Sequence, residues 1–403
     1  MKENKTKKTF TSGSGFSLLH VIIIIFVTAI TSAIATGVIV NNGYKNKDGM
    51  SYSELLEDDN LKEFLNVYSS VVSGYYEDVN KQEMVDAALN AMLNYLGDSY
   101  TTYMNENQAE SLAEKLEGTY KGIGITIEGR KIIGITKNSP AQNSGLQIDD
   151  EIIKINDVDV TSKNASEIVT LIKNQNLEEV KMVVNRNNED KEFTIKTADL
   201  FVPALSYNLI ENTKIGYIYI SIFSNTVYDQ FNDALKDLEA QGMEKLIIDV
   251  RDNTGGYLTQ AEQIASLFLQ ENKVIYSLEN KNGTKTITDK TSEARDYPII
   301  VVINNDSASA SEILAAALKD SYNATLVGTK SYGKGKVQQT VTLSDKTLAK
   351  YTSAKWLRPN GECIDKVGMM PDYEVELDIT KDESGNIVAI TDTQLQKAID
   401  LLK

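Results

Sequence analysis

The sequence predicts an α/β fold built on a mainly parallel sheet, preceded by an inserted β-rich segment and an N-terminal helical region. Beyond residue 200, apolar runs typical of buried strands alternate with amphipathic helical patterns. This alternation builds parallel sheets whose sites lie at the carboxyl ends of the strands. Residues 118–198 carry short alternating runs instead, and residues 61–117 have apolar side chains at helical spacing.

The first 40 residues contain a candidate membrane anchor. Residues 9–44 have no Asp, Glu, Lys or Arg, and residues 18–40 are 23 mostly apolar residues, enough for a transmembrane helix. Four lysines precede them, which predicts a cytoplasmic segment 1–17 and an extracytoplasmic catalytic part of a single-pass protein of the cell membrane. A cleavable signal peptide ending at Ala35 is the alternative, but the apolar residues continue to Val40, which favours an uncleaved anchor.

The next segments are a polar, glycine-containing linker, residues 41–60, and a helical region, residues 61–117. Residues 118–198 then show alternation from Gly122 to Ile127 and an amphipathic helix from Ala165 to Lys173. This pattern predicts a separate, mainly β domain.

Residues 199–390 form the predicted α/β core. A polar glycine loop, Arg251 to Gly256, follows one buried strand and opens a helix, and three serines stand where the strand Ile299 to Ile303 leads into the next helix. Residues 391–403 contain a C-terminal amphipathic helix, which we expect to pack on the N-terminal helices.

The composition excludes several classes of protein. A net charge of −16 repels phosphate backbones, so we expect no nucleic-acid partner. The one histidine, His20, lies in the apolar N-terminal run, so a Ser-His-Asp triad is excluded. Cys363 is the one cysteine, which argues against a cysteine protease and a zinc site. We therefore expect no metal and no cofactor.

Nucleophilic chemistry in this chain would need lysine or a carboxylate as the base. Ser309 lies at a helix start, where backbone N–H groups favour anions, and Lys334 lies between two glycines 25 residues later. Ser309 with Glu312 also fits a capping box, which would make the serine structural.

The segments SASASEI and GKGKVQ resemble the C-terminal processing peptidases, serine-lysine enzymes with the Clp protease/crotonase-like fold. The resemblance implies that Ser309 is the nucleophile, Lys334 the general base and Gln338 the residue that orients the lysine. It also implies an oxyanion hole formed by the N–H groups of Ala310 and of either Gly255 or Gly256. The implied activity is that of a serine-type endopeptidase acting near the C-terminus of proteins.

Residues 118–198 resemble a PDZ domain of the bacterial protease type. Such domains bind the free C-terminal tails of proteins by strand addition, here beside the segment Gly122, Ile123, Gly124 and Ile125. In the resembled family the N-terminal helices also help build dimers, so a homodimer is expected.

The base requires a particular environment. A lysine at its reference pKa of about 10.4 is neutral in only about one molecule in a thousand near pH 7. The fold must therefore desolvate Lys334 to lower its pKa. A carboxylate would raise this pKa, so we expect acidic groups to be excluded from its immediate surroundings.

Two other functions compete with proteolysis. One is a non-catalytic, membrane-tethered scaffold whose PDZ domain only binds protein tails, which the joint presence of serine, lysine, glutamine and paired glycines disfavours. The other is a crotonase-type acyl-CoA enzyme, which the expected external location and the inserted PDZ domain disfavour.

Overall fold

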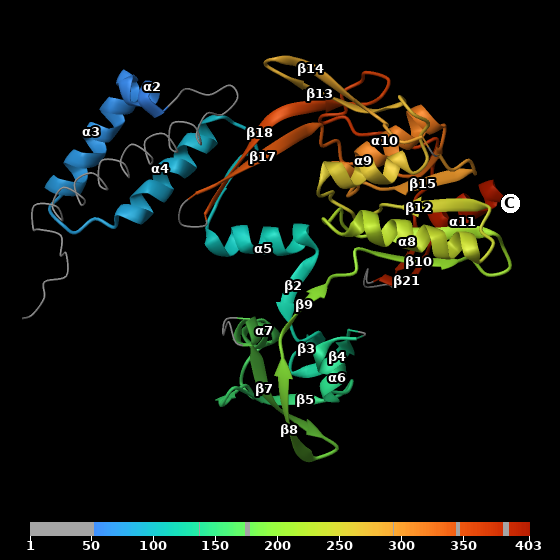
Figure 1. Ribbon diagram of the computed structural model, residues 1–403, viewed down its shortest axis with the longest axis horizontal. Coiled ribbons are helices and arrows are strands. Elements are labelled where there is room, and N and C mark those ends of the chain that lie inside the picture. Colours follow the sequence, from blue (N-terminus) through green and yellow to red (C-terminus); the bar gives the residue numbers. More distant parts are fainter. Residues whose placement is uncertain (1–51, 137, 174–177, 293, 344–346, 382–386) are drawn as a thin grey trace, which may run out of the picture. The chain divides into compact units, whose positions relative to one another are not determined.

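The computed structural model describes residues 52–403, apart from 137, 174–177, 293, 344–346 and 382–386 (Figure 1). The chain divides into two compact units, Met1–Ala88 and Leu89–Lys403. The predicted membrane anchor, residues 18–40, lies outside the described residues. Within the described part, the helices are too short or too polar to cross a bilayer.

The N-terminal region is helical, as its apolar spacing predicted. Its helices are α2 (Tyr52–Glu57), α3 (Asp59–Gly74) and α4 (Lys81–Tyr95). Asp58 caps α3 by accepting a hydrogen bond from the N–H of Leu61 at 3.0 Å. Helix α3 buries none of its residues, and Phe64 and Val67 are more than half exposed.

A short strand and a helix lead from this region into the rest of the chain. They are β1 (Thr102–Met104) and α5 (Glu106–Glu117). Asn105 and Gln108 form a reciprocal capping box at the start of α5, and Gly118 ends the helix in the left-handed conformation.

The β-rich segment forms its own sheet, in the order β3-β4-β5-β7-β8, with β6 paired to β5. Its elements are β3 (Ile125–Glu128), β4 (Lys131–Ile135), α6 (Pro140–Ser144), β5 (Glu151–Ile155), β6 (Val158–Asp159), α7 (Ala165–Lys173), β7 (Glu179–Arg186) and β8 (Glu189–Lys196). Fully buried side chains such as Ile132, Ile152 and Met182 form its core. The segment is entered through β2 (Thr119–Gly122) and left through β9 (Ala198–Phe201), which pair with each other.

The α/β core contains a six-stranded sheet in the order β10-β11-β12-β15-β16-β19. These strands are β10 (Leu205–Leu209), β11 (Ile215–Ile220), β12 (Lys245–Asp249), β15 (Ile299–Ile303), β16 (Thr325–Gly328) and β19 (Tyr373–Glu374). All pairs are parallel except β10 with β11. The mainly parallel sheet predicted from the sequence is therefore present.

Helices cover both faces of this sheet. The main core contains apolar side chains of α8 (Val227–Ala240), α9 (Leu258–Ser266) and α10 (Ala310–Ala317), and a π-helical turn, η1 (Leu318–Tyr322), extends α10 (Figure 1). The C-terminal helix α11 (Thr393–Leu402) packs on the sheet through Ala398 and Leu402, against Ile247 and Val302. Our expectation that it packs on the N-terminal helices was wrong, because its apolar stripe fits the second face of the sheet.

A second sheet carries the segment after the lysine. It contains β13 (Val274–Asn280), β14 (Gly283–Thr288), β17 (Lys336–Thr342) and β18 (Leu348–Leu357), with β1 added beside β18. A hairpin of β20 (Asp378–Lys381) and β21 (Ile387–Thr391) precedes α11.

Candidate active site

The candidate nucleophile Ser309 has an unusual backbone conformation. It lies between β15 and α10 with φ 57° and ψ −113°, a region that residues other than glycine rarely adopt. Such a strained strand-to-helix turn is where hydrolases present a reactive serine. The neighbouring contacts must hold this turn, because an isolated serine would relax out of it.

The two flanking serines provide that support. Ser307 and Ser311 are fully buried, and their hydroxyls donate to the backbone carbonyls of Val250 at 2.7 Å and Asn253 at 2.8 Å. Both carbonyls belong to the stretch that follows β12. The flanking serines therefore bind the nucleophile turn to the glycine loop, and Ser309 is the one whose hydroxyl is not used in this way.

The glycine loop lies directly against Ser309. A side chain at Gly255 would place its Cβ 2.8 Å from the Cβ of Ser309 and 3.1 Å from the nitrogen of Ala310, which explains the need for glycine. The N–H of Gly255 donates to Oδ1 of the buried Asn253 at 2.9 Å. The backbone of Gly256 pairs with Phe223 through its two neighbours, Gly255 and Tyr257, so its own N–H points away from that pairing.

Lys334 lies in the loop between β16 and β17, and its two glycine neighbours have a packing reason. A Cβ at Gly333 would lie 2.7 Å from the nitrogen of Gly368, and one at Gly335 would lie 2.6 Å from the nitrogen of Asp365. The buried Trp356 donates from Nε1 to the carbonyl of Lys334 at 2.8 Å. The backbone of the lysine is thus fixed by contacts on both sides.

Glu312 links the serine segment to the lysine segment. Its buried carboxylate accepts hydrogen bonds from the N–H groups of Ser309 and Lys334, both at 2.9 Å, and of Gly333 at 2.7 Å. The hydroxyl of Ser331 donates to it as well, at 2.6 Å. The glutamate half of the predicted capping box is present, but the same side chain also sets the distance between the serine and lysine segments.

The position of Glu312 contradicts our expectation that acidic groups are excluded from the immediate surroundings of Lys334. Burial raises the pKa of Glu312, and the four hydrogen bonds oppose that rise. Burial is also the main reason that the pKa of Lys334 is lowered; the positive charge of Lys350 adds to the lowering, and Glu312 opposes it. A carboxylate can therefore lie near the candidate base, because hydrogen-bond donors already satisfy it and desolvation of the lysine outweighs its charge.

The structure does not join all members of the predicted site. Among the described residues, Lys334 Nζ forms no hydrogen bond with Ser309 Oγ or with Gln338, although the serine and lysine backbones share Glu312. The amide of Gln338 donates instead to the carbonyl of Lys336 at 3.1 Å and lies 3.5 Å from Oγ1 of Thr352. The register of β17 against β18 shifts between Val337 and Gln338.

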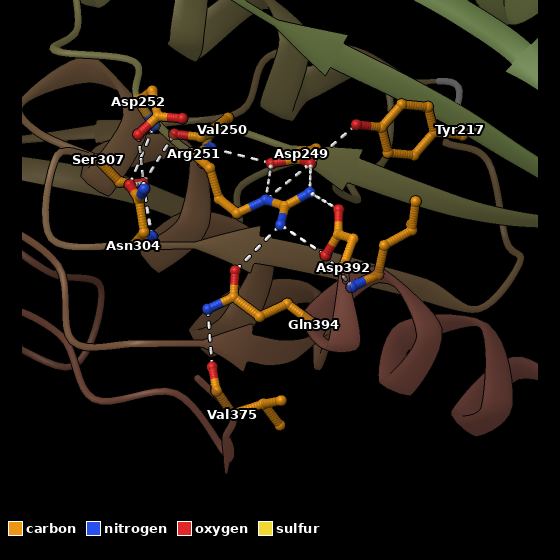
Figure 2. A network of polar contacts seen from close by, with 11 residues as sticks. Tyr217, Asp249, Val250, Arg251, Asp252, Asn304, Ser307, Val375, Asp392 and Gln394 are labelled. Carbon is orange, nitrogen blue, oxygen red and sulfur yellow. Dashed lines mark hydrogen bonds and ion pairs between the residues drawn. The ribbon is translucent and has the colours of Figure 1, made fainter. Parts of the chain in front are cut away.

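Arg251 forms a polar network beside the glycine loop. Its guanidinium is bound by Asp249 from β12 and by Asp392 from the start of α11, with nitrogen to oxygen distances of 2.5 Å and 2.8 Å. Figure 2 shows the guanidinium between these two carboxylates, with Gln394 on a third side. Arg251 thus forms ion pairs both with the end of the preceding strand and with a helix that is distant in sequence.

The residues predicted to bind peptides line one groove of the β-rich domain. The groove has a volume of about 450 Å³ and lies between the stretch 120–127 and helix α7. Gly122, Ile123, Gly124 and Ile125 all border it, although the side chain of Ile123 belongs to the domain core. Strand β3 is an edge of its sheet, which is the position that strand addition requires.

Comparison with known proteins agrees with this organisation. The chain matches the models for peptidase family S41 over residues 214–375, for a PDZ domain over residues 131–186, and for the N-terminal domain of the activating protease CtpB over residues 29–108.

The chain is also similar to individual proteins. It is 34% identical to the carboxy-terminal processing protease CtpA of Bacillus subtilis (strain 168), over 89% of this chain and 78% of that protein. It is 34% identical to a probable CtpA-like serine protease of Staphylococcus aureus (strain MRSA252), over 83% of this chain and 68% of that protein. The solved photosystem II D1 C-terminal processing protease is 21% identical, with a TM-score of 0.47, over 79% of this chain and 87% of that one.

These findings define the class as a protease that carries a PDZ domain. The chain belongs to peptidase family S41. The sequence alone does not distinguish Asn253 and Glu312 as residues that support the site. A buried asparagine within a glycine loop and a glutamate within a helix start are common, and only their tertiary contacts distinguish them.

Proposed function

We propose that this protease is a serine endopeptidase that cleaves near the C-terminus of protein substrates. The observation that carries the proposal is the strained turn at Ser309, whose two flanking serines are committed to backbone carbonyls. The relatives named for carboxy-terminal processing support the substrate class.

In the proposed reaction, Ser309 Oγ attacks the scissile carbonyl while Lys334 takes its proton and later returns it to the leaving amine. The N–H groups of Ala310 and Gly256 stabilise the oxyanion, since the N–H of Gly255 is already bound to Asn253. Gln338 would have to leave its present partners to orient the lysine.

Two variants in the full chain test the mechanism, with an unstructured, C-terminally tagged protein as substrate. Ser309→Ala should abolish cleavage. Lys334→Arg should be equally inactive, because arginine keeps the positive charge but cannot be deprotonated in a protein. Substantial cleavage by Lys334→Arg would exclude lysine as the base.

We further propose that the groove beside β3 selects substrates by their free C-terminal tails. An added peptide strand would bond to the edge of the sheet, and loop N–H groups would hold its terminal carboxylate. A peptide with a free carboxylate should therefore bind clearly better than the same peptide with an amidated end, measured by calorimetry with the Ser309→Ala variant. Equal affinities would refute tail selection.

Attachment to the cell membrane through residues 18–40, with the protease outside, remains part of the proposal and rests on the apolar sequence alone. Membrane fractionation of the full chain tests it, and a mature N-terminus at Thr36 would show that the segment is removed. A non-catalytic scaffold is the second candidate, and it requires that wild-type and Ser309→Ala proteins behave alike towards every substrate.

A further inference from the structure

The segment that follows the N-terminal helices reaches the candidate base. Strand β1 pairs with β18 from Thr102 to Met104, and Tyr100 lies two residues before this strand. The Nζ atom of Lys334 is 5.2 Å from the centroid of the Tyr100 ring, and that of Lys336 is 5.9 Å from it. Both distances lie within the range over which an aromatic face attracts a cation.

Asp98 fixes Tyr100 in this place. Its carboxylate accepts hydrogen bonds from Lys336 Nζ at 3.0 Å and Thr101 Oγ1 at 2.8 Å, and from the hydroxyl of Thr352 on β18. The N–H of Thr352 donates to Thr101 at 3.2 Å. Burial would raise the pKa of Asp98, but these hydrogen bonds lower it to about 2, so the anchor stays charged at neutral pH. The hydrogen bonds of Asp98 and Thr101 therefore fix the chain on both sides of Tyr100.

The charged and titratable groups around Lys334 come from several elements. Lys350 on β18 disfavours its ammonium form, whereas Glu312 on α10 favours it. Tyr332 forms a hydrogen bond with Tyr100, and the charge of Asp365 acts on the Tyr100 hydroxyl. Lys336 lies over the same Tyr100 ring as Lys334. Burial, the hydrogen bond with Tyr332 and the charges of Asp365 and Glu312 raise the pKa of Tyr100 to about 12, so its ring is neutral and its face can receive a cation.

We propose that Tyr100 is a positioning residue for Lys334, whose ring holds the charged lysine and releases it when the proton is lost. This inference rests on the proposed role of Lys334 as the base. A neutral amine has no cation–π attraction to the ring, so loss of the proton frees it to approach Ser309. In this structure the lysine contacts the ring and makes no hydrogen bond with Ser309 Oγ among the described residues, which corresponds to the held state.

The test compares the pH dependence of kcat/KM for full-chain variants on the tagged substrate. Tyr100→Leu keeps apolar bulk over the lysine but removes the aromatic face. The midpoint of the acid limb should fall by about 0.5 to 1.5 pH units, because the charged form loses its attraction. Tyr100→Phe keeps the face and should leave the midpoint unchanged. An unchanged or raised midpoint in Tyr100→Leu would overturn the inference.

A second substitution covers the case in which Tyr100→Leu does not fold. Trifluorophenylalanine at position 100 has nearly the shape of phenylalanine, but its face attracts cations less. The midpoint should move down relative to Tyr100→Phe, and identical midpoints would contradict the inference.

Lys334→Arg separates this inference from the function on which it rests. If Lys334→Arg is active, lysine is not the base, and both the proposed mechanism and the role of Tyr100 are overturned. An inactive Lys334→Arg together with a wild-type pH profile for Tyr100→Leu and for the fluorinated variant overturns the role of Tyr100 alone.

Discussion

The proposed nucleophile and the proposed base of this protease are held in opposite ways. The turn around Ser309 is fixed by buried hydroxyl groups on both sides, bonded to the backbone of the neighbouring loop. The backbone of Lys334 is also fixed, through Glu312 and Trp356, but its half-buried side chain has an aromatic ring as its partner. The difference indicates that Ser309 is preorganised, whereas the position of the Lys334 side chain depends on its charge.

The comparison predicts which substitutions reduce stability and which reduce only activity. Residues around the serine should affect folding, because their hydrogen bonds maintain a strained turn. The lysine itself should affect folding in the opposite direction, because burying an ammonium group is unfavourable.

The largest loss of stability is expected for Glu312→Gln, because this side chain joins the two regions. A glutamine offers one acceptor oxygen and turns an amide N–H group toward the donors that the carboxylate accepted. We expect the free energy of unfolding to fall by about 3 kcal/mol or more and kcat/KM to fall at least about tenfold.

Urea unfolding and steady-state assays measure the two effects of Glu312→Gln. The exposed Glu110 on α5 provides a matched control, and Glu110→Gln should leave both quantities unchanged. If Glu312→Gln unfolds at the wild-type urea concentration, Glu312 does not hold the two segments together.

The flanking serines should give intermediate effects that differ from each other. The carbonyl of Asn253 also accepts the N–H of Ala308, whereas Ser307 is the one donor to the carbonyl of Val250 among the described residues. We expect about 2 kcal/mol lost in Ser307→Ala and about 1 kcal/mol in Ser311→Ala. Cleavage per folded molecule should stay within a few-fold of wild type, and complete inactivation of either variant would make that serine a candidate nucleophile.

The smallest expected effect is a gain in stability. In Lys334→Met the buried cation is replaced by an apolar side chain, so the inactive variant should be slightly more stable than wild type near pH 7. The folded pKa of Lys334 lies below its unfolded value, so between the two values the unfolded chain binds more protons and wild-type stability rises with pH. The gap between variant and wild type should therefore close as pH approaches the unfolded pKa of about 10.4. Urea midpoints at several pH values measure it, and a gap that widens with pH would contradict a desolvated lysine.

Much of the core could be predicted from the sequence, because strand and helix periodicities depend on neighbouring residues. The serine turn and the glycine loop were placed correctly beside each other, since both follow strands of one parallel sheet. The special position of Ser309 among three serines came from the family resemblance, and the backbone angles now give it a physical basis.

The remaining features depend on contacts between distant segments. The shift in strand register before Gln338 results from pairing with β18, which spacing along one strand cannot reveal. The tolerance of Glu312 near the lysine likewise depends on donors from Ser331 and Gly333, 19 and 21 residues away. The sequence pattern shows an acidic residue at position 312, but it does not show the hydrogen-bond donors that offset the charge of that residue.

The bond between Arg251 and Asp392 bears on how the enzyme is made. The two residues are 141 positions apart, and Asp392 belongs to the start of the C-terminal helix. While a ribosome is still translating the chain, Arg251 has been synthesised but this partner has not. The loop that ends in Gly255 and Gly256 therefore acquires its full support only after nearly all of the core has emerged.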